Sequence, residues 1–277
     1  MGAGFSVKFF FGRDFVIFEN RMKKALLEGR VVFGPMVSEL RNPGIAILFA
    51  QAGFDFFFID MEHSSFSLET VSDMILAARA ANIPAIVRPS TRTSHEYLSR
   101  PLDAGAAGLL VPQIQSVDDV KKVVEWGRYQ PLGERGMALA RQHTFFEGGK
   151  AEETMNRLNQ EVLIALQIEH RDALERLPEI LSVPGIDAAF VGPSDLSASL
   201  GKPGQASDPE VESSIRRVIQ VSKEKGIIPG IHTDSIEKAK YWIDQGMRMI
   251  GFSTDIKLIL DICKGSVKQL RALTPPG

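Results

Sequence analysis

Residues 53–63 read G-F-D-F-F-F-I-D-M-E-H, and this stretch sets a pattern that the rest of the chain repeats. A glycine comes first, a short apolar run comes next, and acidic residues and a histidine stand directly after the run. A glycine at such a place ends a helix and lets the chain turn. A short continuous apolar run is typical of a strand buried on both faces of a parallel sheet. The stretch therefore predicts a helix–turn–strand unit with polar residues at the carboxyl end of the strand.

The same unit recurs along the chain, with glycines before further apolar runs at Gly105, Gly185, Gly226 and Gly246. Strands are predicted at 31–37, 55–60, 85–88, 108–112, 162–168, 187–191, 227–231 and 249–252, and helices at 68–81, 117–127, 171–181, 209–225, 236–245 and 256–273. Eight buried strands alternating with helices favour a closed (β/α)8 TIM barrel over an open doubly wound sheet. No Pro- or Ser-rich linker divides the chain. We expect one barrel domain, residues 31–277, after a Phe-rich N-terminal extension, residues 1–30.

Composition excludes several classes of protein. The chain has 277 residues with 32 Lys plus Arg against 34 Asp plus Glu, so it has no basic field for nucleic acid or an anionic membrane. Its single cysteine, Cys263, cannot form an internal disulfide or a zinc cluster. The Phe-rich opening lacks the cleavage site of a signal peptide, and no stretch is apolar enough to span a bilayer. We expect a cytoplasmic protein with a small-molecule substrate.

Polar side chains come directly after five of the predicted strands. At the ends of these strands stand Asp60, Glu62 and His63 for the second, Arg88 for the third, Gln167, Glu169 and His170 for the fifth, Ser194 and Asp195 for the sixth, and His232 for the seventh. Active sites of these barrels lie at the carboxyl ends of the strands. One charged residue there is commonly a helix cap or a surface charge, but convergence from five strands predicts an active site.

A carboxylate pair from adjacent strands, Glu169 and Asp195, suits a hard divalent cation such as Mg2+ or Mn2+. The alternative is that Asp195 only caps a helix and that Glu169 pairs with Arg171. No lysine stands at a strand end, which disfavours Schiff-base chemistry. Nucleotide-binding loops and a G-x-S-x-G elbow are also missing from the sequence.

Three further residues have both a catalytic and a structural interpretation. His63 is either a general base or a structural histidine. Arg88 offers a fork for a carboxylate or an enolate oxygen, or forms a surface ion pair. Asp103 either orients His63 or faces solvent. The long connection 128–161 breaks the strand–helix pattern, and we expect it to lie over the catalytic end of the barrel.

Six motifs together resemble the HpcH/HpaI aldolase family, over roughly residues 31–273. They are F-D-F-F-F-I-D-M-E-H (54–63), V-R-P-S (87–90), L-D-A-G-A-A-G-L-L-V-P (102–112), R-Y-Q-P-L-G-E-R-G (128–136), Q-I-E (167–169) and G-I-D-A-A-F-V-G-P-S-D-L-S (185–197). The resemblance implies a class II aldolase that cleaves a 4-hydroxy-2-oxo acid, such as a 2-keto-3-deoxy sugar acid or a 4-hydroxy-2-oxo diacid, reversibly to pyruvate and an aldehyde through a metal-stabilised enolate.

The resemblance also implies roles for individual residues. Glu169 and Asp195 bind Mg2+, Mn2+ or Co2+, His63 is the catalytic base, Arg88 binds and polarises the keto-acid oxygen, and Asp103 supports His63. Gln167, Pro193 and Ser194 join Arg88 and Asp195 in binding the substrate, because the helix that opens at 193–195 presents N–H groups to a carboxylate. Family members are typically hexamers, trimers of dimers that exchange the last helix.

Three departures from the family pattern concern the substrate pocket. His170 stands where the family usually has Thr or Ser, His232 stands where it generally has an apolar residue, and the first strand, F-G-P-M-V, lacks a common Trp. These changes predict an altered pocket beyond the reacting carbons. The alternative function is a related C–C lyase or decarboxylase acting on oxaloacetate or a CoA thioester; a non-catalytic barrel is the remaining hypothesis.

Overall fold

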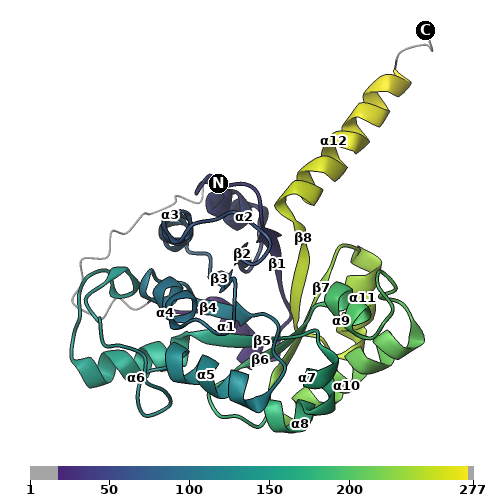
Figure 1. Ribbon diagram of the computed structural model, residues 1–277. Helices are drawn as coiled ribbons and strands as arrows, with labels where there is room; N and C mark the ends of the chain where they lie inside the picture. Colours follow the sequence, from purple (N-terminus) through teal and green to yellow (C-terminus); the bar gives the residue numbers. More distant parts are fainter. Residues whose placement is uncertain (1–17, 274–277) are drawn as a thin grey trace.

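A computed structural model describes residues 18–273 and confirms the TIM barrel. Eight parallel strands close in sequence order, each pairing with its neighbours and β8 returning to β1 (Figure 1). The strands are β1 (Val32–Val37), β2 (Phe57–Asp60), β3 (Ala85–Arg88), β4 (Gly108–Val111), β5 (Leu163–Ile168), β6 (Ala188–Val191), β7 (Ile228–Thr233) and β8 (Met249–Thr254). All eight lie within about two residues of the predicted bounds.

Helices surround the strands. They are α1 (Arg21–Leu27), α2 (Ile45–Ala52), α3 (Leu68–Ala80), α4 (His95–Asp103), α5 (Val117–Gly127), α6 (Ala151–Glu161), α7 (Arg171–Glu175), α8 (Leu177–Ile180), α9 (Pro193–Ser199), α10 (Pro209–Lys225), α11 (Ile236–Gln245) and α12 (Asp255–Ala272), with a 3-10 turn at Gln142–Thr144. The helix predicted at 171–181 is two short helices that meet at Arg176. No helix in the range 18–273 is both long and apolar enough to cross a membrane.

Alternation of side chains along the strands divides the core into two parts. Outward residues pack under the helices in one large cluster, and inward residues fill the barrel. The inner filling is aromatic: Phe58 and Phe190 meet edge to face with ring centroids 5.3 Å apart. Glycines make room for these rings, since a Cβ at Gly34 would lie 2.7 Å from the Phe56 ring and one at Gly230 would lie 2.6 Å from the Phe190 ring.

Helix α1 closes the amino-terminal end of the barrel. Met22 and Leu26 join the inner apolar cluster. The buried ammonium of Lys23 lies 2.8 Å from Asp187 and donates to the carbonyl of Val162, so it ties the helix to the starts of β5 and β6. Residues 20–27, which fall inside the predicted N-terminal extension, thus pack on the barrel. The Phe-rich residues 1–17 lie outside the described residues.

The long connection 128–161 does not cover the catalytic end, and that expectation is wrong. Buried Arg128 donates to the carbonyls of Gly185 and Val162 and pairs with Asp187 at 2.6 Å, which places it at the starts of β5 and β6. The physical reason is that α5 has already returned the chain to the amino-terminal end of the strands. The segment after α5 is therefore a helix-to-strand connection, and such connections lie opposite the active site.

Helix α12 extends away from the barrel (Figure 1). Its first residue, Asp255, is buried, and its carboxylate accepts from the backbone N–H groups of Glu39 and Leu40 after β1. Lys257 and Leu258 are half-buried, and the helix is exposed from Ile259 onward. It carries an exposed apolar stripe at helical spacing, which we call the α12 stripe: Ile256, Ile259, Leu260, Cys263, Val267 and Leu270.

Stability should fall in acid because of a buried histidine in the long connection. Burial and the nearby Arg135 charge lower the pKa of His143 from 6.5 to about 4. Between pH 6.5 and 4, His143 is protonated in the unfolded chain but stays neutral in the folded chain. The free energy of unfolding therefore falls as the pH falls from 6.5 toward 4. His143→Gln should remove about 2 kcal/mol of the stability difference between pH 8 and pH 5, measured by urea unfolding. The same substitution at exposed His95 should leave that difference unchanged; an unchanged difference in His143→Gln would contradict the assignment.

Candidate active site

Arg88 is a buried cation at the carboxyl end of β3. Strand register places it directly beside Asp60 of β2. Its Nε and Nη2 donate to the two carboxylate oxygens of Asp60 at 2.8 and 2.7 Å, and its Nη1 lies 3.2 Å from Glu62. Burial lowers the pKa of Arg88, but the hydrogen bonds and charge of Asp60 and the charge of Glu62 outweigh it, so the net pKa is raised. The surface-pair interpretation is excluded, since Arg88 is 7% exposed.

Glu169 stands just beyond β5 as a carboxylate almost out of contact with water. It is 2% exposed, accepts from the backbone N–H of Gln113 at 2.8 Å, and is hydrogen-bonded by the Gln167 amide. Burial raises its pKa to about 7, and the negative charges of Glu62 and Asp195 add to the rise against the opposing hydrogen bonds. Its hydrogen-bond partners are Gln113 and Gln167, so the alternative pairing with Arg171 finds no support.

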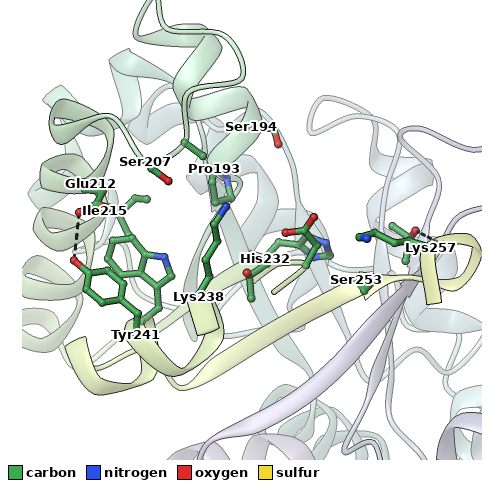
Figure 2. Close-up of a pocket in the computed structure, with 15 residues that line it drawn as sticks. Pro193, Ser194, Ser207, Glu212, Ile215, His232, Lys238, Tyr241, Ser253 and Lys257 are labelled. Atoms are coloured by element: carbon green, nitrogen blue, oxygen red, sulfur yellow. Dashed lines mark hydrogen bonds between the residues drawn. The ribbon is translucent and has the colours of Figure 1, made fainter. Parts of the chain in front are cut away.

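Asp195 lies in the first turn of α9, the short helix that follows β6. The N-cap of α9 is Gly192, which has no side chain, and among residues 18–273 no hydrogen bond ends on the Asp195 carboxylate, so Asp195 does not cap the helix. A Cβ at Gly192 would lie 2.6 Å from the Glu169 carboxylate, so this glycine lets the β6 loop approach Glu169 closely. The first turn of α9 also carries Pro193 and Ser194, which line a cavity of about 420 Å³ (Figure 2).

The carboxylates present fit a divalent cation. Glu169 is buried among like charges, an arrangement that a cation stabilises. Carboxylate oxygens are the ligands that Mg2+ and Mn2+ prefer. Within residues 18–273, no three His, Cys, Asp or Glu side chains cluster as a complete metal cage. A site built on Glu169 and Asp195 would therefore leave several coordination positions for substrate and water.

His63 lies at the rim of this cluster, on the turn after β2. Its side chain is 61% exposed, and its Nε2 is 3.8 Å from Glu62. The alternative of a satisfied structural histidine does not fit this exposure. His63 is thus near Glu62 and open to a substrate arriving from solvent.

Asp103 is not beside His63 within one chain. It is the last residue of α4, near the amino-terminal end of the barrel. Its carboxylate accepts from buried Arg135 at 2.5 Å, and its backbone carbonyl lies 3.1 Å from Nδ1 of His143. The structure thus gathers Arg88, Glu169, Asp195 and their neighbours at one end and leaves Asp103 at the other.

Sequence reasoning noted Asp60 and Glu62 but gave them no role in the site. The signal was available in the D-x-E spacing after β2. In a strand end, residues two apart point to the same side, so Asp60 and Glu62 both face the neighbouring Arg88. The arginine was recognised, but the anions that hold it were not.

Fold and site together define a barrel lyase with its chemistry at the carboxyl ends of the strands. Residues 36–261 match the model of the HpcH/HpaI aldolase/citrate lyase family. The 4-hydroxy-2-oxo-heptane-1,7-dioate aldolase of Escherichia coli is 35% identical over 243 residues, covering 87% of this chain and 91% of the relative. The chain belongs to the HpcH/HpaI family, and it is an aldolase, a carbon–carbon lyase.

Comparison with solved structures supports the same family assignment. An HpcH/HpaI aldolase from Desulfitobacterium hafniense DCB-2 superposes with a TM-score of 0.87 at 32% identity, covering 92% of this chain and 97% of that one. The citrate synthase SbnG superposes with a TM-score of 0.82 at 28% identity, covering 90% and 97%. One barrel thus serves more than one carbon–carbon reaction among these relatives.

Asp60 should be as important to stability as to the site. Asp60→Asn removes the charge that faces buried Arg88 and should destabilise the fold by about 3 kcal/mol, measured by chemical denaturation. Glu39→Gln makes the same chemical change on an exposed residue and serves as the control. Equal stability of the two variants would mean that Glu62 alone balances Arg88.

Proposed function

We propose that this aldolase is divalent-metal-dependent and cleaves a 4-hydroxy-2-oxo acid to pyruvate and an aldehyde. The observation that carries the proposal is buried Glu169, surrounded by like charges at 2% exposure, beside a guanidinium that Asp60 holds in place. The E. coli relative, which is named for a 4-hydroxy-2-oxo diacid, supports a substrate of this class.

Glu169 and Asp195 would hold the ion, which supplies a Lewis acid for the 2-oxo group when bound. The N–H groups at the start of α9 and the Gln167 amide face the same space and would receive the substrate carboxylate. Because Asp60 occupies Nε and Nη2 of Arg88, Nη1 is the donor that would reach the oxo oxygen, and it would do so beside Glu62, which lies 3.2 Å away. The fixed guanidinium would stabilise the negative charge that grows on this oxygen.

The bond changes are simple. His63 takes the proton from the C4 hydroxyl, the C3–C4 bond breaks, and its electron pair forms the pyruvate enolate while C4 becomes the aldehyde. A proton added to C3 then gives pyruvate. The exposed position of His63 suits this role, because the aldehyde half of the substrate must extend toward solvent.

A metal-dependent release of pyruvate is the expected result. A panel of 4-hydroxy-2-oxo acids, treated with EDTA and then with Mg2+, Mn2+ or Co2+, should yield pyruvate only when metal is present. Glu169→Ala and His63→Ala should each lower the rate at least about 100-fold. Mn2+ should raise the melting temperature of the wild type and of His63→Ala, but not of Glu169→Ala.

Oxaloacetate belongs in the same panel, because the structural likeness to a citrate synthase keeps a related carbon–carbon reaction open. If no hydroxy acid releases pyruvate but oxaloacetate loses CO2 in a metal-dependent reaction, the decarboxylase alternative replaces the proposed substrate class. Pyruvate release that survives both EDTA and Glu169→Ala would contradict a metal-dependent mechanism.

We further propose a homo-oligomer, a hexamer built as a trimer of dimers that exchange α12. The exposed α12 stripe needs an apolar partner surface, and the direction of α12 away from its own barrel suits one on another subunit (Figure 1). If Asp103 supports a His63, as the family resemblance implies, the histidine must belong to another copy, because the two residues lie at opposite ends of one barrel. The site would then be complete only in the assembly.

Placing a charge in the α12 stripe should break the assembly. Val267→Glu puts a carboxylate in the stripe and should shift the mass in solution toward smaller species, measured by light scattering. Gln269→Glu adds the same charge on another face of α12 and should leave the mass unchanged. An unaltered hexamer in Val267→Glu, or a monomeric wild type, would overturn the exchange.

A further inference from the structure

His232 is an inward-facing residue at the mouth of the barrel. Its neighbour Ile231 packs in the outer core, so alternation along β7 turns His232 toward the interior. Strand register sets His232 beside Gly251 of β8, where a Cβ would lie 2.8 Å from its Nδ1 and 2.9 Å from the Phe190 ring. The imidazole therefore rests on the aromatic filling of the barrel.

The Nδ1 atom of His232 has no hydrogen-bond partner among the described residues, although it is shielded from water. A buried polar atom without a partner is unfavourable and uncommon in a folded protein. Such an atom at the mouth of a catalytic barrel indicates a ligand that supplies the missing partner.

The imidazole borders the active site. It lines a cavity of about 420 Å³ together with Pro193 and Ser194, which precede Asp195 in the first turn of α9, and Figure 2 shows His232 on the cavity wall with Ser253. Ser253 has a left-handed backbone, φ 62°, which is uncommon for a residue other than glycine and typical of functional positions. The two polar groups therefore line one cavity from the neighbouring strands β7 and β8.

The charged groups that act on His232 are Arg88, Asp234 and Asp60. Burial, together with the Arg88 charge, lowers the pKa of His232 to about 4, so the ring is neutral near pH 7. A neutral imidazole has one donor and one acceptor nitrogen, and it matches a hydroxyl group, which also donates and accepts. A carboxylate is a poorer match, since it can only accept a hydrogen bond and so pairs with the donor nitrogen alone.

We propose that His232 hydrogen-bonds a hydroxyl group on C3 of the 2-oxo acid, and that this enzyme prefers a 3-hydroxy-2-oxo acid over pyruvate as its nucleophile. The inference rests on the proposed function. Arg88 and the carboxylate pair occupy the oxo oxygen and the carboxylate, which leaves the C3 substituent to meet the mouth of the barrel. Pyruvate has only a methyl group there and leaves Nδ1 unpaired; 3-hydroxypyruvate is the simplest acid that pairs it.

The test compares 3-hydroxypyruvate with pyruvate in the Mg2+-loaded enzyme. Calorimetry gives the two dissociation constants. Proton NMR in deuterium oxide monitors exchange at C3, in which the C3–H bond breaks, the proton passes to solvent, and a solvent deuteron adds to the enolate. The wild type should bind and exchange 3-hydroxypyruvate about 10- to 100-fold better than pyruvate.

Three variants make the test specific. His232→Leu keeps an apolar side chain of similar size and should abolish the preference or reverse it. His232→Asn retains a hydrogen-bonding group near the position of Nδ1 and should keep part of the preference even if the leucine variant folds poorly. Ser207→Ala changes another residue of the cavity, on the loop before α10, and should keep the full preference.

The possible outcomes distinguish a failure of this inference from a failure of the proposed aldolase function. Exchange of both acids with a ratio near one in the wild type, or a preference unchanged in His232→Leu, would overturn the role of His232 and leave the aldolase intact. If the wild type prefers oxaloacetate over 3-hydroxypyruvate and His232→Leu loses that preference, His232 binds a carboxylate on C3 rather than a hydroxyl. This result would also overturn the inference. Exchange of neither acid in the wild type would remove the proposed enolate chemistry and this inference with it.

Discussion

The pairing of Arg88 with Asp60 is the interaction on which the catalytic end depends. Both residues occupy the last inward position of their strands, directly above an aromatic filling that solvates no charge. Either charge alone would be costly at that depth, and the bidentate geometry leaves each with a partner. Because β2 and β3 are adjacent and in register, the pair needs no loop to assemble it. The guanidinium then has a fixed direction before any substrate arrives.

The other polar groups are arranged around this pair by the same alternation. Gln167 and His232 stand at inward positions of β5 and β7, and Glu169 lies one step above Gln167 at the rim. Glu62 joins the two sides, because its charge acts on Arg88 and on Glu169. The site is thus a ring of polar side chains at or just beyond the strand ends, with Asp195 supplied by the first turn of α9 and His63 by the turn after β2. Rigid placement of this kind is what charge stabilisation requires.

Much of this could be predicted from the sequence, because burial on both sides gives each strand an unmistakable apolar run. The strand ends, Arg88, Glu169 and Asp195 were all accessible from that pattern. The position of the connection 128–161 and the contact between Asp103 and His63 were harder, because both depend on which end of the barrel a segment reaches. The connection follows a completed helix, α5, and Asp103 is the last residue of α4, a helix that the sequence pattern did not predict. The ion pair between Arg88 and Asp60 was missed, because the register that sets these residues side by side cannot be predicted from the sequence of one strand.

The glycines beneath the mouth also bear on how such a chain diverges. Gly34, Gly230 and Gly251 lie against aromatic rings or against His232, so even a methyl group at these places collides with a neighbour. The depth of the pocket is therefore hard to alter from below. New substrates are more easily accommodated by exchanging single residues in the layer above, where His232 stands. The barrel architecture can therefore stay the same while single substitutions at its mouth change the substrate preference.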